Sequence, residues 1–170
     1  MGEPARADRR VAAGKPAVAP APPADLLAAP GYGARRLYQA YLAAWNRHVD
    51  SVLTGPQFAV LSAVRAYPGN DQSSLAGAVA LDTSTMADLC RRLERRGLIR
   101  RIESPRDARR KLLSLTDEGE TVLAQVNRRA RRLDKALLDG DDIASDVDIA
   151  ALLNALGARW EAVAAFDELD

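Results

Sequence analysis

The chain has 170 residues, of which 48% are hydrophobic and only 5% aromatic. This composition favours a mostly helical core of Ala, Leu and Val over a β-sandwich, which is richer in aromatic and β-branched residues. The single cysteine excludes an internal disulfide and a cysteine-based metal site. No apolar run reaches the roughly 18 residues of a membrane span, and the N-terminus lacks the compact apolar segment of a signal peptide, so we expect a cytoplasmic protein.

The formal net charge of +1 hides two strongly charged segments. Residues 86–111 contain ten Lys and Arg against four Asp and Glu, whereas residues 140–170 contain one Arg against eight Asp and Glu. The basic segment is therefore where we expect contact with phosphates. The alternative is that its arginines only form a solvated helix face.

The first predicted elements are a tail and a helix. Residues 1–30 are rich in Ala and Pro, cannot bury enough apolar surface to order themselves, and are expected to be a flexible tail. A helix is predicted from Ala34 to about Leu53 because its apolar residues recur at helical spacing. These residues are Leu37, Tyr41, Trp45, Val49 and Val52.

Three further helices are predicted in the middle of the chain. Thr54 is expected to cap the first of them, with Pro56 in its first turn and Phe58, Val60, Leu61 and Val64 on its buried face. After a turn at 67–71, a short helix is predicted at about 72–79. A tight turn at 80–82 then leads to a helix at about 83–96, which Gly97 closes in a left-handed conformation.

A hairpin and two helices are predicted at the end. Short strands are expected at 98–103 and 111–115, with the tip at 104–110. Thr116 is expected to open a capping box and a long helix to about Leu138. A break is predicted at 139–142, and the last helix carries the apolar residues Ile149, Leu152, Leu153, Leu156, Trp160, Val163 and Phe166.

A helix that begins with hydroxyl residues and runs into a basic hairpin is typical of a winged helix-turn-helix. Its start can enter a major groove, and an arginine of the hairpin can reach the neighbouring minor groove. The predicted fold is thus mostly α with a small β-hairpin wing. The predicted DNA contacts are Gln72, Ser73, Ser74, Thr83, Ser84, Thr85, Asp88, Arg91, Arg95, Arg106, Asp107, Arg109 and Arg110.

Arg109 is the principal predicted wing contact, oriented by Asp107 through a charge-assisted hydrogen bond. Two alternatives stay open: this Asp–Arg pair only stabilises the hairpin, and Asp82 or Thr83 only caps its helix.

The helices outside the predicted winged domain, in residues 31–53 and 117–170, each carry an apolar stripe. They are too few to form a sealed bundle within one subunit, so packing against a second copy is the economical solution. We therefore expect residues 54–116 to bind DNA and the flanking helices to form a twofold dimer, which suits an inverted-repeat site on double-stranded DNA.

The motifs of residues 31–168 together resemble the MarR family of bacterial transcriptional regulators. The most specific pieces are LDTSTM at 81–86, RLERRGLIRR at 92–101, PRDARRK at 105–111 and LTDEG at 115–119, with LTGPQFAVL upstream at 53–61. The resemblance implies a homodimer of winged lobes that represses nearby genes and leaves DNA when a small molecule binds. Ala108 interrupts the family's usual Asp-Arg-Arg wing tip, which leaves one backbone contact in question.

Within the family, the chain looks like the subgroup that responds to aromatic acids. Such an effector needs a cation for its carboxylate and a flat apolar wall. Both are predicted on one broad helix face formed by Arg35, Tyr38, Tyr41, Trp45 and His48. Alternatively, Tyr41 and Trp45 are part of the dimer core, and Arg35 is a surface or DNA-facing residue. No cofactor or metal is expected.

Two other functions compete with DNA binding. An enzyme is disfavoured because the one His has no nucleophile motif beside it and no glycine-rich phosphate loop is present. A winged-helix module for protein–protein contact, without DNA or ligand response, is the remaining alternative. Cys90 is expected to pack in the core.

Overall fold

The computed structural model describes residues 20–105, 107–138 and 147–166. The chain divides into two compact units, residues 1–39 and 40–170, and each is described by itself. The predicted break at 139–142 and residues 1–19 of the predicted tail lie outside the described residues. No helix within the described residues is long and apolar enough to cross a membrane.

The described part of the first unit contains α1 (Ala24–Leu27) and the start of α2 (Pro30–His48). α1 lies inside the segment predicted as a tail. α2 begins four residues earlier than predicted, with Pro30 at its first position, where a missing N–H costs nothing. It also ends earlier, because the Asp50 carboxylate accepts the backbone N–H groups of Val52 and Leu53 (2.8 and 2.7 Å) and holds this stretch in a turn.

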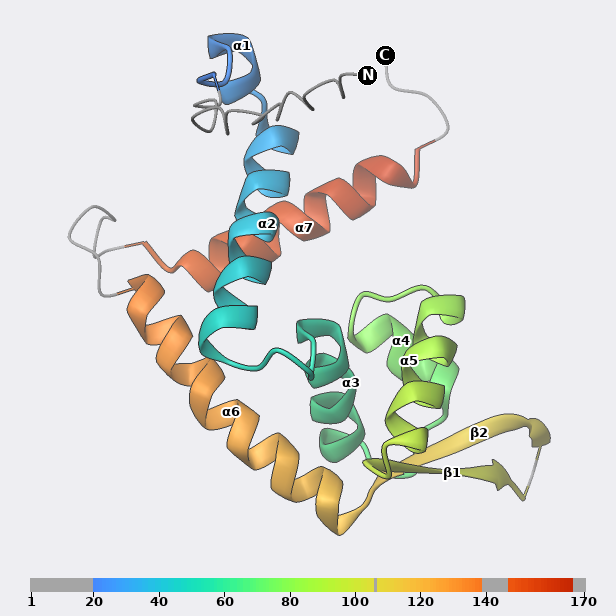
Figure 1. Cartoon of the computed structure of the whole chain (residues 1–170). Coiled ribbons are helices and arrows are strands. Elements are labelled where there is room, and N and C mark those ends of the chain that lie inside the picture. Colours follow the sequence, from blue (N-terminus) through green and yellow to red (C-terminus); the bar gives the residue numbers. More distant parts are fainter. Residues whose placement is uncertain (1–19, 106, 139–146, 167–170) are drawn as a thin grey trace, which may run out of the picture. The chain divides into compact units, whose positions relative to one another are not determined.

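The core of the second unit joins α3 (Gly55–Ala66), α4 (Gln72–Ala78) and α5 (Thr83–Arg95) to the strands and to α6 (Asp117–Leu138) (Figure 1). Each element contributes fully buried side chains, so the three helices pack on one another and on the sheet as a single body. Large side chains with under 2% exposure are Leu53, Leu61, Leu75, Met86, Leu93, Leu113 and Leu123.

The predicted helix signals are largely confirmed. Thr54 caps α3 and forms a full capping box with Gln57: each side chain accepts a hydrogen bond from the other residue's backbone N–H. Asp82, rather than Thr83, caps α5. Gly97 follows α5 with φ of 71°, the left-handed conformation that glycine adopts without strain.

The wing is an antiparallel pair of β1 (Ile99–Ser104) and β2 (Asp107–Leu115). β2 begins four residues before the predicted strand, so the tip is shorter than expected. The register runs regularly from Ile99 opposite Leu115 to Glu103 opposite Lys111, and then shifts so that Ser104 faces Asp107. The shift is a β-bulge, which a simple alternation pattern does not reveal.

α6 begins directly behind the wing. Thr116 accepts the N–H of Gly119 (3.0 Å) and donates its hydroxyl hydrogen to the Gly97 carbonyl (2.6 Å). The predicted capping box is wrong, because its third helical residue is Gly119, which has no side chain to return the bond. A Cβ at Gly119 would lie 2.0 Å from the Leu98 carbonyl oxygen, so glycine permits this close approach.

The last described helix, α7 (Ile149–Ala164), begins at Asp148, whose carboxylate accepts the N–H of Ala151 (2.9 Å). It has no buried residue among those described. Large apolar side chains stay exposed on it and just after it: Leu152, Leu153, Leu156, Trp160 and Phe166.

Candidate nucleic-acid interface

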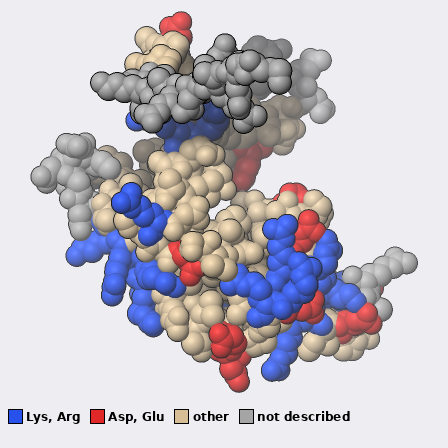
Figure 2. Space-filling model, viewed as in Figure 1, with Lys and Arg blue, Asp and Glu red and all other residues tan. Residues whose placement is uncertain are grey.

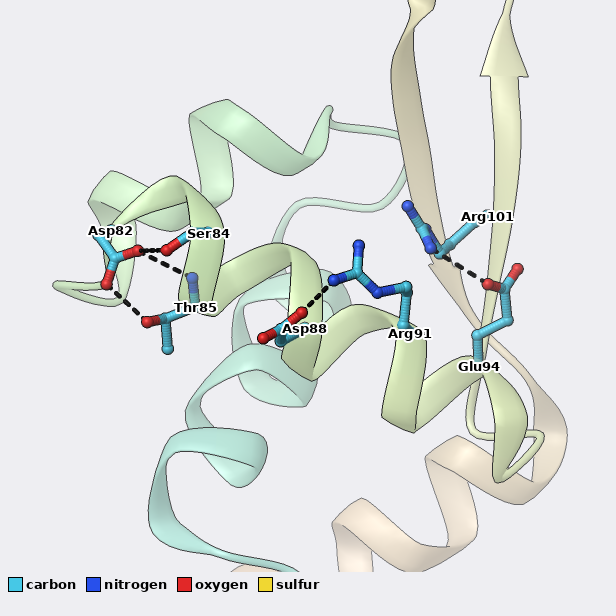
Figure 3. Close-up of polar contacts among 7 residues, drawn as sticks. All are labelled: Asp82, Ser84, Thr85, Asp88, Arg91, Glu94 and Arg101. Atoms are coloured by element: carbon cyan, nitrogen blue, oxygen red, sulfur yellow. Dashed lines mark hydrogen bonds and ion pairs between the residues drawn. The ribbon is translucent and has the colours of Figure 1, made fainter.

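The start of α5 is organised around the Asp82 carboxylate (Figure 3). It accepts the N–H of Thr85 (2.8 Å) and the hydroxyl hydrogens of Thr85 (2.6 Å) and Ser84 (2.5 Å). These hydrogen bonds, that of the Ser84 hydroxyl first, hold the pKa of Asp82 far below its ordinary value. The carboxylate is thus charged, and Ser84 and Thr85 keep their oxygen lone pairs for an outside donor.

Further along α5, acidic side chains pair with the arginines. Asp88 forms an ion pair with Arg91 one turn later, and both side chains are about half exposed. Glu94 pairs with Arg101 of β1 at 3.3 Å, which ties the helix to the wing. Arg95 is exposed near the end of α5. The predicted contacts Arg91 and Arg95 therefore both lie at the protein surface.

The start of α4 is organised by Asp71, which was predicted only as part of a turn. Asp71 caps α4 and accepts the backbone N–H groups of Ser73 (3.1 Å) and Ser74 (3.2 Å) and the Ser74 hydroxyl hydrogen (2.6 Å). The backbone N–H groups of Ser73 and Ser74, two of the predicted DNA contacts, already have an internal acceptor. Gln72 is half-buried, and its Oε1 has no hydrogen-bond partner in the described structure.

In the wing, Asp107 and Arg110 are exposed, and Lys111 pairs with Glu103 on β1 at 2.5 Å. Arg110 reaches back to form an ion pair with Asp71. Arg106 and the side chain of Arg109 lie outside what the structure describes. The predicted Asp107–Arg109 contact stays a prediction.

The predicted DNA-facing residues that the structure describes belong to α4, α5 and β2. Figure 2 shows Lys and Arg side chains gathered over α5 and the wing, with acidic side chains beside them, and a second group of Lys and Arg over α6. A surface of this kind attracts a polyanion. A local pattern in the sequence could have identified Asp71, since an Asp directly before Gln-Ser-Ser is a helix-capping signal.

The five predicted effector residues all belong to α2 but differ in environment. Arg35 lies 5.9 Å from the ring centre of Tyr32, and Tyr38 is half exposed. Trp45 is only 3% exposed; its indole N–H donates to the Leu53 carbonyl (2.7 Å), and its ring packs on Phe58. Trp45 is therefore a core residue of its own subunit.

His48 lines a groove of about 610 Å³ between α2 and α6 in the second unit. Its lining is mostly apolar and also includes two arginines of α6, Arg129 and Arg132. Arg129 is held by Asp50 at 3.0 Å. The full lining is Ala44, His48, Arg129, Arg132, Leu133, Ala136 and Leu137.

Cys90 is fully buried in α5, as expected, and burial raises the pKa of its thiol to about 11. The thiol is therefore unreactive in the folded chain. Among the described residues, no group of three His, Cys, Asp or Glu side chains is placed to hold a metal.

Comparison with known proteins gives consistent matches. The model of the MarR family matches residues 53–111, from the end of the α2–α3 turn into β2. The transcriptional regulator HosA of Escherichia coli O111:H- is 41% identical over 90 residues, which span 53% of this chain and 66% of HosA.

Solved structures match over more of the chain. The PcaV transcriptional regulator of Streptomyces coelicolor, in complex with its natural ligand, aligns with a TM-score of 0.75 and 40% identity over 85% of this chain and 99% of PcaV. Bordetella bronchiseptica BpsR, whose DNA binding is regulated by 6-hydroxynicotinic acid, aligns with a TM-score of 0.67 and 30% identity over 75% of this chain and 97% of BpsR. The repressor CouR, bound to a 23-mer DNA duplex, aligns with a TM-score of 0.64 and 28% identity over 83% of this chain and 96% of CouR.

Proposed function

Because the chain belongs to the MarR family of DNA-binding transcriptional regulators, we propose that it is a homodimeric repressor of an inverted-repeat operator, released by a small aromatic acid. The proposed DNA binding rests mainly on one observation: the capped start of α5 and the basic wing lie on adjoining elements of the second unit. CouR, of the same fold, is solved on a DNA duplex.

The dimer is supported by the apolar surface of α7. This helix has no buried residue among those described, and four of its large apolar side chains are at least 43% exposed. A monomer rarely leaves such a surface in water. A second copy covers it, and two winged units then face two half-sites.

The effector class is supported by BpsR, which responds to an aromatic acid. We place the acid's carboxylate on a cation of α2 or α6. Arg35 is the candidate predicted from sequence, and Arg132 beside His48 is the candidate of the groove. Arg35→Ala and Arg132→Ala distinguish them: the variant that still binds operator but no longer leaves it identifies the partner.

The first experiment is selection of genomic fragments by the purified protein, with and without phenolic acids. We expect enrichment of an inverted repeat that one acid abolishes.

A salt titration on the selected duplex then gives a steep fall in affinity, because binding releases counterions from DNA. Arg109→Ala should weaken this binding strongly and leave the dimer intact. Absence of any enriched fragment would favour the protein-contact module instead.

A further inference from the structure

The structure connects α4 to the wing through one buried carboxylate. Asp71 has 8% side-chain exposure and caps α4. The same residue forms a β-bridge with Leu112 of β2, so the turn before α4 lies along the wing as a partial third strand. Next to the bridge, on its Leu113 side, Gly69 N–H donates to the Leu113 carbonyl (2.8 Å) and Leu113 N–H donates to the Asn70 carbonyl (3.1 Å).

The bulge in the hairpin makes this connection important. The register passes directly from the pair Glu103–Lys111 to the pair Ser104–Asp107, which leaves residues 108–110 of β2 between them. Regular cross-strand pairing does not fix this segment, which ends at Arg110. The guanidinium of Arg110 binds the Asp71 carboxylate from a position two residues before the bridge.

We propose that Asp71 and Arg110 are positioning residues for DNA binding: their ion pair fixes the bulged segment 108–110 on the start of α4, and Arg110 acts through Asp71 rather than on a phosphate. This inference rests on the proposed DNA binding and refines it. Arg110 was predicted as a DNA contact; in the structure its guanidinium forms an ion pair with the carboxylate of Asp71 instead.

The proposal makes a prediction opposite to simple electrostatics. Asp71→Asn keeps one oxygen that can cap α4, but it removes the charge and replaces the oxygen that accepts from the Ser74 hydroxyl and from Arg110 with an NH2 group. Removal of a negative charge normally strengthens binding to DNA. If the pair positions the wing, Asp71→Asn instead weakens binding about tenfold, Arg110→Gln does the same, and the double variant is no weaker than either single one.

The test is a double-mutant cycle on a duplex that the wild-type protein selects from a random pool, with affinity measured by fluorescence anisotropy. Glu103→Gln is the matched control, since it breaks the exposed pair with Lys111 on the same hairpin and should leave affinity unchanged or higher. Additive losses, or tighter binding by Asp71→Asn, would overturn the proposal and show that Arg110 touches DNA directly.

Hydrogen exchange supplies a readout without DNA. In Asp71→Asn the amides of Gly69 and Leu113 should exchange faster, while the α5 amides keep their protection. If the wild-type protein selects no duplex, the proposed function fails, and the exchange rates still decide whether the pair holds the wing. Unchanged exchange at both amides would overturn the positioning role.

Discussion

At the scale of single residues, aspartates at helix starts organise the surface that we assign to DNA. Asp71, Asp82 and Asp148 each cap a helix, but only Asp71 also holds an arginine from a distant strand. The capping pattern of Asp71 is visible in the sequence. Its pairing with Arg110, 39 residues later, could not be predicted, because it depends on how the turn before α4 lies against β2.

The acid sensitivity of folding should reflect Asp71. Hydrogen bonds from Ser74 and Arg110 lower its pKa from 3.8 to about 2 in the folded chain. Its contribution to stability is therefore complete above about pH 3.8 and is lost as the pH falls towards 2. We expect Asp71→Asn to be less stable than wild type in urea unfolding at pH 6, with the difference shrinking at pH 2.5. An equal difference at both pH values would contradict this assignment.

Trp45 gives a second prediction at this scale. Trp45→Phe keeps an aromatic ring against Phe58 but leaves the Leu53 carbonyl without its donor. An unsatisfied buried carbonyl costs about 1–3 kcal/mol, so the free energy of unfolding measured in urea should fall by that amount. Tyr67→Phe, at an exposed ring, is the control and should change stability little. Loss of effector response with unchanged stability would instead favour the role in the effector site predicted from sequence.

At the scale of elements, helical spacing and glycine positions predicted the order of the main helices and strands, while the errors lie at ends set by side chains. α2 stops at His48 because Asp50 captures two N–H groups, although apolar spacing continues to Val52. β2 starts early because a bulge lets it extend without regular alternation. Ends of this kind depend on local hydrogen bonds that hydrophobic periodicity does not contain.

The junction of the wing with α6 depends on Gly119. In Gly119→Ala the new Cβ meets the Leu98 carbonyl at 2.0 Å, so α6 or the wing must move. We expect a loss of about 1–3 kcal/mol in thermal or urea unfolding. Gly77→Ala in α4 is the matched control: nothing lies within 4 Å of its new Cβ, and helix propensity predicts a gain of roughly 0.5–1 kcal/mol. Equal effects of the two changes would refute the close contact.

At the scale of the whole molecule, the unpartnered helix α7 predicts how the chain assembles. Leu156→Glu places a charge on its exposed apolar surface, where Leu156 is 50% exposed. Because a monomer tolerates a surface charge and an interface does not, sedimentation equilibrium should change from dimer to monomer, with circular dichroism unchanged. Operator affinity should fall with it, since one lobe then reads one half-site. A dimer that persists would move the interface away from α7.

The two candidate sites differ in how much of each could be predicted from the sequence. The residues predicted to contact DNA cluster along a contiguous stretch, so Ser84, Thr85 and Arg91 could be placed on a surface from local pattern alone. The surroundings of the residues predicted to bind an effector depend on packing between helices far apart in sequence. Trp45 thus proved to be a core residue, and the arginines of the groove around His48 come from α6, which the pattern of α2 could not indicate.

The burial of Cys90 makes the chain its own reporter of unfolding. It is the only thiol, and it is buried in the core with the other buried residues of α5, Met86, Leu89 and Leu93. An alkylating reagent can reach it only when this helix leaves the core. The labelling rate of the native protein therefore reports how often α5 opens, and slower labelling on an operator duplex would measure how much DNA stabilises α5 in the core, with no engineered probe.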